Sequence, residues 1–378
     1  MAQSITVLVG TSKGVFLIDS DQSRRDWRLS GPYCDGWPSN HVLGDPATGT
    51  IWAAAGGEFQ GSGVWRSEDH GATWTCSQLS NGMMDEFLAR DEGFRKMLGR
   101  GPSPDAPFKG KVQGLWVLGL VGGTLYAGAK PAALYASHDR GETWDLVQSL
   151  ADHPSQPQWE PGGAGLVLHT ILGAGDKLWL GISAAGVFAS EDGGQTWERR
   201  NRRTNQATTP DPISGECGHD VGLCVHNMVR SCDGRVIYQQ NHRGVFRSRD
   251  EGRSWDEITE GLPSPFGFPV VTHPADPATL WVLPLSEWGG RTPLGGEATV
   301  WRSRDAGDSW QPLRQGLPDQ AHFTVLRQAM ATDQCETAGV YFGTNSGSVF
   351  ASFDEGESWQ EIARHLPTVL GVEVMQRG

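Results

Sequence analysis

Residues 137–144 read SHDRGETW, and this stretch decides the fold because the chain repeats its pattern. The common form is S-x-D-x-G-x-[S/T]-W, which we call the box. Five further copies match it, at residues 67–74, 190–197, 248–255, 303–310 and 352–359. Successive copies start 49 to 70 residues apart, and chance does not place so many matched positions six times. A motif that recurs at this period is typical of folds assembled from equivalent modules.

The residue types of the box are those of a tight turn between two strands. An apolar run such as residues 63–66 precedes a box and an alternating run follows it, which is the pattern of a hairpin. Asp139 can accept backbone N–H bonds within the turn, and Gly141 tolerates the positive φ that a tight turn requires. Trp144 offers a large apolar surface to the neighbouring repeat. Because one active site does not need six equivalent carboxylates, we expect the box aspartates to be structural.

A seventh, degenerate copy lies at residues 14–27, where the apolar run and the closing Trp27 remain. Dividing 378 residues by seven gives 54, which is close to the box spacing. Each repeat has room for four short strands, the signature of a propeller blade. We therefore predict an all-β protein with one domain over residues 1–378, a seven-bladed β-propeller with four-stranded blades. The first repeat lacks its innermost strand, and a lone strand at residues 368–374 can complete it and close the ring.

Composition limits the environment and the partners of the protein. The chain has no run of about 18 apolar residues, so we expect no membrane span. Its N-terminal residues 1–10 alternate like a first strand rather than a signal peptide, and its six cysteines are scattered, so we expect reduced thiols in the cytoplasm. A net charge of −13 disfavours nucleic acid and anionic membranes as partners. The sequence indicates no particular oligomeric state.

The boxes resemble the BNR/Asp-box repeats of sialidases and related glycosyl hydrolases. The resemblance covers nearly the whole chain and implies a propeller whose boxes point away from the active site. It also implies a glycan-acting hydrolase, although lyases, sorting receptors and assembly factors carry the same box. Sialidases have an Arg-Ile-Pro motif near the N-terminus and three arginines that bind the substrate carboxylate, whereas the first repeat here has Lys13. We therefore expect a protein of this sialidase-like group without sialidase activity.

Candidate site residues lie on the face opposite the boxes, where propellers usually bind ligands over the central channel. Turns between second and third strands, and links between blades, form that face. We predict that a small-molecule or carbohydrate ligand binds there. The candidate catalytic residues are Glu58, Asp220, His226 and His242. The candidate ligand-binding residues are Trp37, His41, His169, His219, Asn241, Arg243, Glu287 and Arg291.

Each candidate also has a plainer interpretation. A histidine beside an aspartate is usually solvated or hydrogen-bonded, and Glu58 and Glu287 can be surface charges in Gly-rich loops. Trp37 can be core or a platform that stacks on a sugar. The Cys-x-His patterns at Cys217 and Cys224 could bind zinc, but their spacing matches no standard structural zinc motif. We therefore predict no cofactor and no metal, and expect Cys224 to be a small core residue.

Three functions remain open from the sequence. A glycan hydrolase normally needs two carboxylates about 5–10 Å apart, so a carboxylate pair at the channel mouth would support it. The candidates for that pair are Glu58, Asp220, Glu287 and Glu297. A lyase would use histidines as acid and base with Arg243, so a His/Arg cluster without a carboxylate pair would support it. A channel lined by glycine and apolar side chains would support a non-catalytic propeller that binds a ligand or a protein.

Residues 81–111 are an insertion after a fourth strand. Residues 83–90 and 94–98 have helical spacing and are followed by Gly and Pro. We expect the insertion to lie over the face opposite the boxes, where the ligand is predicted to bind, as a rim or lid, with simple packing or an interface as alternatives.

Overall fold

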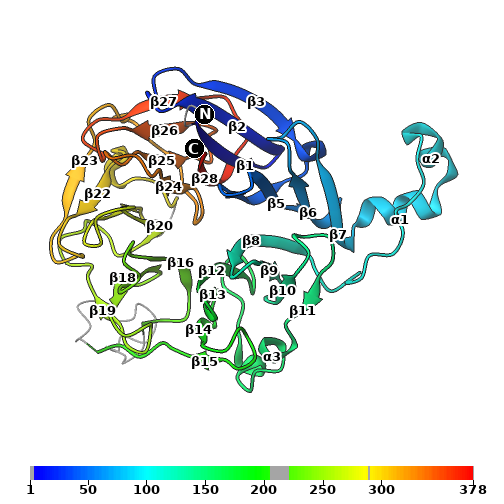
Figure 1. The fold of residues 1–378 in the computed structure, drawn as a ribbon, viewed down its shortest axis with the longest axis horizontal. Helices are drawn as coiled ribbons and strands as arrows, with labels where there is room; N and C mark the ends of the chain where they lie inside the picture. Colours follow the sequence, from blue (N-terminus) through cyan, green and yellow to red (C-terminus); the bar gives the residue numbers. More distant parts are fainter. Residues whose placement is uncertain (1–3, 205–220, 288–289, 378) are drawn as a thin grey trace.

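The computed structural model describes residues 4–204, 221–287 and 290–377. Its strands form seven separate four-stranded antiparallel sheets, which are arranged as blades around a central axis (Figure 1). The predicted seven-bladed β-propeller is confirmed. We number the blades along the chain and list their strands from the channel outward.

Blade one contains β28 (Val369–Arg377), β1 (Ser4–Thr11), β2 (Gly14–Asp21) and β3 (Arg28–Tyr33). Blade two contains β4 (Ser39–Asp45), β5 (Thr50–Gly57), β6 (Gly61–Ser67) and β7 (Thr75–Asn81). Blade three contains β8 (Gly114–Val121), β9 (Thr124–Lys130), β10 (Leu134–Ser137) and β11 (Asp145–Leu146). Blade four contains β12 (Leu168–Ala174), β13 (Lys177–Ile182), β14 (Gly186–Ser190) and β15 (Glu198–Arg199).

Blade five contains β16 (Val225–Arg230), β17 (Ile237–Asn241), β18 (Gly244–Ser248) and β19 (Asp256–Glu257). Blade six contains β20 (Gly267–Thr272), β21 (Leu280–Pro284), β22 (Val300–Ser303) and β23 (Gln311–Leu313). Blade seven contains β24 (Met330–Thr332), β25 (Val340–Gly343), β26 (Val349–Ser352) and β27 (Gln360–Ala363). The helical elements are α1 (Met83–Arg90), α2 (Glu92–Leu98), α3 (Gln148–Ala151), η1 (Cys34–Gly36), η2 (Gln156–Gln158) and η3 (Leu294–Gly296).

The ring is closed by the C-terminal strand. β28 pairs with β1 in antiparallel register, from Arg377 opposite Ser4 to Val369 opposite Thr11. The two ends of the described chain therefore meet in blade one (Figure 1). The predicted closure is confirmed, and it covers the edge of β1 that would otherwise be left unpaired.

The boxes form the turns between third and fourth strands. In blade three, the Asp139 carboxylate accepts hydrogen bonds from the backbone N–H groups of Glu142 (3.0 Å) and Thr143 (2.9 Å). Gly141 has φ 93°, and its N–H donates to the Ser137 hydroxyl at 2.7 Å. The side chain of the aspartate is thus used inside the turn, as an Asx-type turn requires.

The closing tryptophans join neighbouring blades. Trp255 of blade five is fully buried, and its indole N–H donates to the Arg200 carbonyl of blade four at 2.9 Å. Trp310 of blade six makes the same bond to the Ile258 carbonyl of blade five, also at 2.9 Å. Each of these indoles therefore seals one blade against the preceding one.

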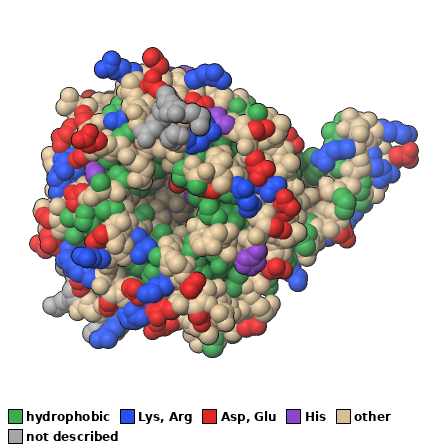
Figure 2. All heavy atoms as spheres, viewed as in Figure 1, with side chains coloured by type: hydrophobic (Ala, Val, Ile, Leu, Met, Phe, Trp, Pro, Cys, Tyr) green, Lys and Arg blue, Asp and Glu red, His purple; other side chains and the backbone are tan. Residues whose placement is uncertain are grey.

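The innermost strands enclose a cavity of about 430 Å³ on the ring axis, and Figure 2 shows the hollow at the centre of the ring. Its polar wall groups include His41, Gln328 and Glu373. The Glu373 carboxyl makes no hydrogen bond or ion pair with any described residue, and burial raises its pKa to about 7. Burial also lowers the pKa of His41 to about 4.

The insertion after β7 contains the two predicted helices, α1 and α2. They project outward from the ring and do not extend over the channel (Figure 1). Asn81 and Asp85 hold the base of this arm, because their side-chain oxygens accept the backbone N–H groups of Ala106 (2.7 Å) and Ser103 (2.8 Å). The expectation of a lid is therefore wrong. Neither these helices nor the others in the described ranges are long and apolar enough to cross a membrane.

Candidate functional site

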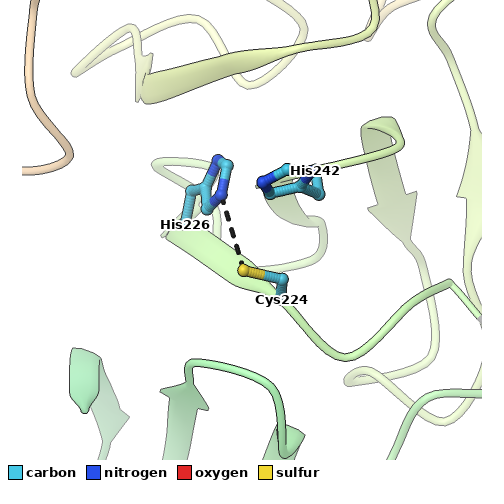
Figure 3. Close-up of side chains that lie close together, drawn as sticks. All are labelled: Cys224, His226 and His242. Atoms are coloured by element: carbon cyan, nitrogen blue, oxygen red, sulfur yellow. Dashed lines mark hydrogen bonds between the residues drawn. The ribbon is translucent and has the colours of Figure 1, made fainter. Parts of the chain in front are cut away.

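The turns between second and third strands lie on the face opposite the boxes, which we call the ligand face. On it, the structure brings together Cys224, His226 and His242 of blade five (Figure 3). Cys224 directly precedes β16, His226 is the second residue of that strand, and His242 lies in the turn between β17 and β18. Antiparallel pairing of β16 with β17 places these residues side by side. We call them the Cys/His cluster.

The ligand atoms of the Cys/His cluster all lie within 4.8 Å of one another. Cys224 Sγ is 3.7 Å from His226 Nε2, and the two imidazole rings are 5.1 Å apart in an edge-to-face arrangement. His226 Nδ1 is 2.6 Å from the Gly267 carbonyl oxygen. Because a carbonyl only accepts, Nδ1 carries the proton and Nε2 presents its lone pair to Cys224.

Aromatic rings and two arginines surround the Cys/His cluster. The ring of Phe268 lies 4.8 Å from that of His226, and the ring of Phe266 lies 4.9 Å from that of His242. The guanidinium of Arg327 lies over Phe268 at 4.6 Å, and that of Arg291 is 5.7 Å from both phenylalanines. These cations stack on the rings and make the site positive.

Arg327 is partly buried, and its guanidinium makes no hydrogen bond or ion pair with the residues that the structure describes. Burial lowers its pKa to about 10. Burial and the charge of Arg327 also hold the pKa of His226 well below its ordinary value. The pKa of His242 is lowered by burial, then by Arg291 and Arg327. Both imidazoles are therefore neutral at pH 7 and can accept a proton.

Glu287 supplies the carboxylate of the site. It belongs to the long connection between β21 and β22 in blade six, and its Oε1 lies 3.8 Å from His242 Nδ1. The side chain of Glu287 is 24% exposed and that of His242 34%, so solvent reaches the pair. A carboxylate beside an imidazole orients the ring and stabilises its protonated form.

Two other candidates of blade five shape the turn that carries His242. The amide of the buried Asn241 donates to the Gly222 carbonyl at 3.0 Å, and its oxygen accepts the N–H of Arg243 at 3.3 Å. Arg243 is half-buried, and burial followed by the charge of Arg203 lowers its pKa. Asn241 is thus a structural residue of the turn, and the side chain of Arg243 lies beside Gly222.

Two histidines occupy equivalent places near the starts of other innermost strands. The buried His41 accepts the N–H of Leu118 at its Nδ1 (3.2 Å) and lines the central cavity. His169 is completely buried against Trp116, with ring centroids 5.8 Å apart. Its ring nitrogens have no hydrogen-bond partner among the described residues, and burial, then Arg327, holds its pKa well below the ordinary value.

The remaining described candidates lie elsewhere on the ring. Glu58 is exposed in the turn between β5 and β6 of blade two, three blades away from His226. Trp37 packs edge-on against Trp65 at 5.7 Å. With Phe59, both tryptophans line a cavity of about 490 Å³ beneath the helical insertion. Neither Glu58 nor Trp37 belongs to the Cys/His cluster. His219 and Asp220 lie outside the described residues.

Sequence reasoning missed Arg327, Phe266 and Phe268. Arg327 stands in the link before β24, within residues 324–330, which read TVLRQAM. An arginine among mostly apolar residues was the available signal. Cys224 was expected in the core, whereas the structure leaves it partly exposed beside His226.

The fold and the site define a seven-bladed propeller with an imidazole, thiol and guanidinium site on its ligand face. No protein-family model matches the chain. It is 25% identical over 152 residues to an oligoxyloglucan-reducing end-specific xyloglucanase of Emericella nidulans, a match that covers 40% of this chain and 17% of the relative. It is 24% identical over 289 residues to a xyloglucanase of Paenibacillus sp, covering 68% of this chain and 24% of the relative. The chain thus spans about a fifth of the length of these curated relatives.

Solved structures share the fold at lower identity. The GH74 xyloglucanase of Xanthomonas campestris superimposes with a TM-score of 0.61 at 19% identity, over 95% of this chain and 54% of that one. The apo form of AztD from Citrobacter koseri superimposes with a TM-score of 0.57 at 10% identity, over 99% of this chain and 98% of that one. These similarities establish the propeller and leave its chemistry to the site.

Proposed function

We propose that this protein is a glycan-acting hydrolase that binds a small acidic saccharide over its Cys/His cluster. The observation that carries the proposal is Arg327, a partly buried guanidinium with no anionic partner among the described residues. A cation withdrawn from water gains most from an anionic ligand group that forms charge-assisted hydrogen bonds with it. Arg291 on the same phenylalanines adds a second positive charge. The sequence similarity to xyloglucanases supports a carbohydrate ligand.

The His242–Glu287 pair supplies the acid–base chemistry in this proposal. In hydrolysis, water adds to the anomeric carbon, the glycosidic C–O bond breaks, and the leaving oxygen gains a proton. A neutral His242 can take a proton from the attacking water, and Glu287 at 3.8 Å stabilises the imidazolium that forms. The imidazolium then gives up this proton, which reaches the leaving oxygen through solvent and restores the neutral ring. We assign this role to His242 rather than His226, because His226 is buried whereas the side chain of His242 is 34% exposed and can meet the attacking water.

A screen of neutral and acidic oligosaccharides, xyloglucan fragments included, tests the proposal through binding and release of reducing ends. We expect Arg327→Met to weaken the affinity for acidic saccharides by about ten- to a hundred-fold, because one charge-assisted hydrogen bond contributes about that much. The affinity for neutral saccharides should stay unchanged. Glu287→Gln should keep binding and lose about 10²–10⁴ in turnover. Arg235→Met is the matched control, since Arg235 has a side chain 86% exposed. Equal binding of acidic sugars by the wild type and Arg327→Met would refute the proposal.

A lyase is the second candidate, because Glu287 is the one carboxylate that the described residues place beside the histidines. In a uronate, Arg327 would neutralise the carboxylate, His242 would remove the proton at C5, and the C4–O bond would break to leave a C4=C5 double bond. This reaction consumes no water, and its product absorbs ultraviolet light as a conjugated acid. Reducing ends without that absorbance indicate hydrolysis, and binding without either product indicates a non-catalytic propeller.

A further inference from the structure

We propose that Cys224, His226 and His242 form a binding site for one divalent transition-metal ion of the zinc class. The sequence predicted no metal, because the spacing of the Cys-x-His patterns at Cys217 and Cys224 matches no standard structural zinc motif. The fold adds the third ligand, His242, from the turn that follows the adjacent strand β17 (Figure 3). The proposal is independent of the glycan chemistry.

The distances in the cluster are those of a tetrahedral site before an ion enters it. With zinc–sulfur bonds of about 2.3 Å and zinc–nitrogen bonds of about 2.0–2.1 Å, tetrahedral geometry separates the S and N ligand atoms by about 3.6 Å. Cys224 Sγ and His226 Nε2 are 3.7 Å apart. All three ligand atoms lie within 4.8 Å of one another, so an ion would draw His242 closer to the other two ligands.

His226 already has the outer partner of a metal ligand, and His242 has a carboxylate nearby that lies beyond hydrogen-bond distance. A histidine that binds a metal usually donates its other N–H to a carbonyl or a carboxylate, which fixes the ring and its tautomer. His226 has the Gly267 carbonyl at 2.6 Å from Nδ1, so its Nε2 lone pair points into the cluster. His242 has Glu287 at 3.8 Å from Nδ1, and Figure 3 shows a ring nitrogen of His242 turned toward His226.

The ligand types select the class of metal. A thiolate with two imidazoles suits zinc and its neighbours, whereas magnesium and calcium prefer oxygen ligands. Three protein ligands leave the fourth tetrahedral position for water or a ligand oxygen, as in catalytic rather than structural zinc sites. His242 is 34% exposed, so the cluster can be reached from solvent.

The positive charges of the two arginines disfavour binding of a divalent cation, so the remaining ligands must supply negative charge. A divalent ion with one thiolate carries a net charge of +1, and Arg291 and Arg327 add to it. The site therefore needs Cys224 as thiolate and favours an anion in the fourth position. The plainer arrangement is a neutral thiol that hydrogen-bonds to His226 or to the Ser183 hydroxyl at 3.8 Å.

Cobalt(II) separates these two arrangements, because a tetrahedral cobalt–thiolate centre absorbs visible and near-ultraviolet light. The full chain, stripped with a chelator and kept reduced, is titrated with cobalt(II) and then with zinc. We expect one equivalent of cobalt to bind with tetrahedral ligand-field bands and a thiolate charge-transfer band, and zinc to displace it. Cys224→Ser should remove the charge-transfer band, and His242→Gln, which removes a ligand, should weaken binding by at least the roughly ten- to hundred-fold loss that follows removal of an outer partner.

Cys232→Ser and His138→Gln are the matched controls, because both residues are exposed and lie outside the cluster. They should titrate like the wild type. Circular dichroism checks that each variant is folded, and His242→Gln keeps the test decisive if Cys224→Ser does not fold, since His242 lies in a partly exposed turn. Absence of the bands at saturating cobalt, or bands that survive both cluster variants, would overturn the proposal. Because no saccharide is present, failure of the hydrolase proposal would leave this result unaffected.

Discussion

Replacing Glu373 with glutamine is expected to stabilise the protein at alkaline pH and to change its stability much less at acidic pH. Glu373 lies on β28 and lines the central cavity, where its carboxyl makes no hydrogen bond or ion pair with the described residues. A charge there loses hydration and gains no partner, so the neutral acid is favoured in the folded state.

The size of the effect follows from the pKa. Burial raises it from 4.5 to about 7. A carboxyl whose pKa is higher in the folded than in the unfolded state makes its full contribution to stability below pH 4.5, the pKa of the unfolded state. This contribution is lost as the pH rises through about 7, the pKa of the folded state. A shift of this size corresponds to about 3 kcal/mol, of which about 2–3 kcal/mol is lost between about pH 5 and pH 8. Glutamine has no charged form and avoids that loss.

Urea unfolding followed by tryptophan fluorescence at pH 5 and pH 8 measures this effect. The gain of Glu373→Gln over the wild type should be about 2–3 kcal/mol larger at the higher pH. Glu336→Gln is the control, since Glu336 is exposed and should respond equally at both values. An equal difference at the two pH values, or a matching gain in the control, would refute a neutral carboxyl in the channel.

Three further changes test the fold. Deleting residues 369–378 removes β28 and leaves the edge of β1 unpaired, so size-exclusion chromatography should show aggregation. A monomer that still unfolds cooperatively would contradict closure of the ring by this strand. Trp255→Ala leaves a cavity at a fully buried site between blades and should lower the free energy of unfolding in urea by about 3–5 kcal/mol. A loss near zero would contradict the role of this indole in sealing blade five against blade four. The neutral His41 accepts the N–H of Leu118, and its pKa is lowered from 6.5 to about 4. The unfolded chain therefore binds a proton more readily, and wild-type stability should fall as the pH decreases from 6.5 to about 4. The loss should reach about 3 kcal/mol, and His41→Asn, which keeps an acceptor without titrating, should flatten that part of the pH profile.

The sequence by itself determined the number of blades, the place of the boxes and the closing strand. The reason is that each box is complete within eight residues: Asp139 bonds to backbone groups three and four positions away, and Gly141 needs only its own φ. Such local bonds leave a readable pattern in the chain. Counting the repeats then exposed residues 368–374 as a strand without a partner.

Only the tertiary structure decided which candidates meet. Cys224 and His242 come together through one strand pair, while Glu287 comes from the connection within blade six and Arg327 from the link between blades six and seven. Nothing in a repeat shows which of its turn residues face a neighbouring blade, because that depends on the rotation of each blade about the axis. The packing of blades likewise places the guanidinium of Arg327 over Phe268 of blade six, where it makes no hydrogen bond or ion pair with the described residues.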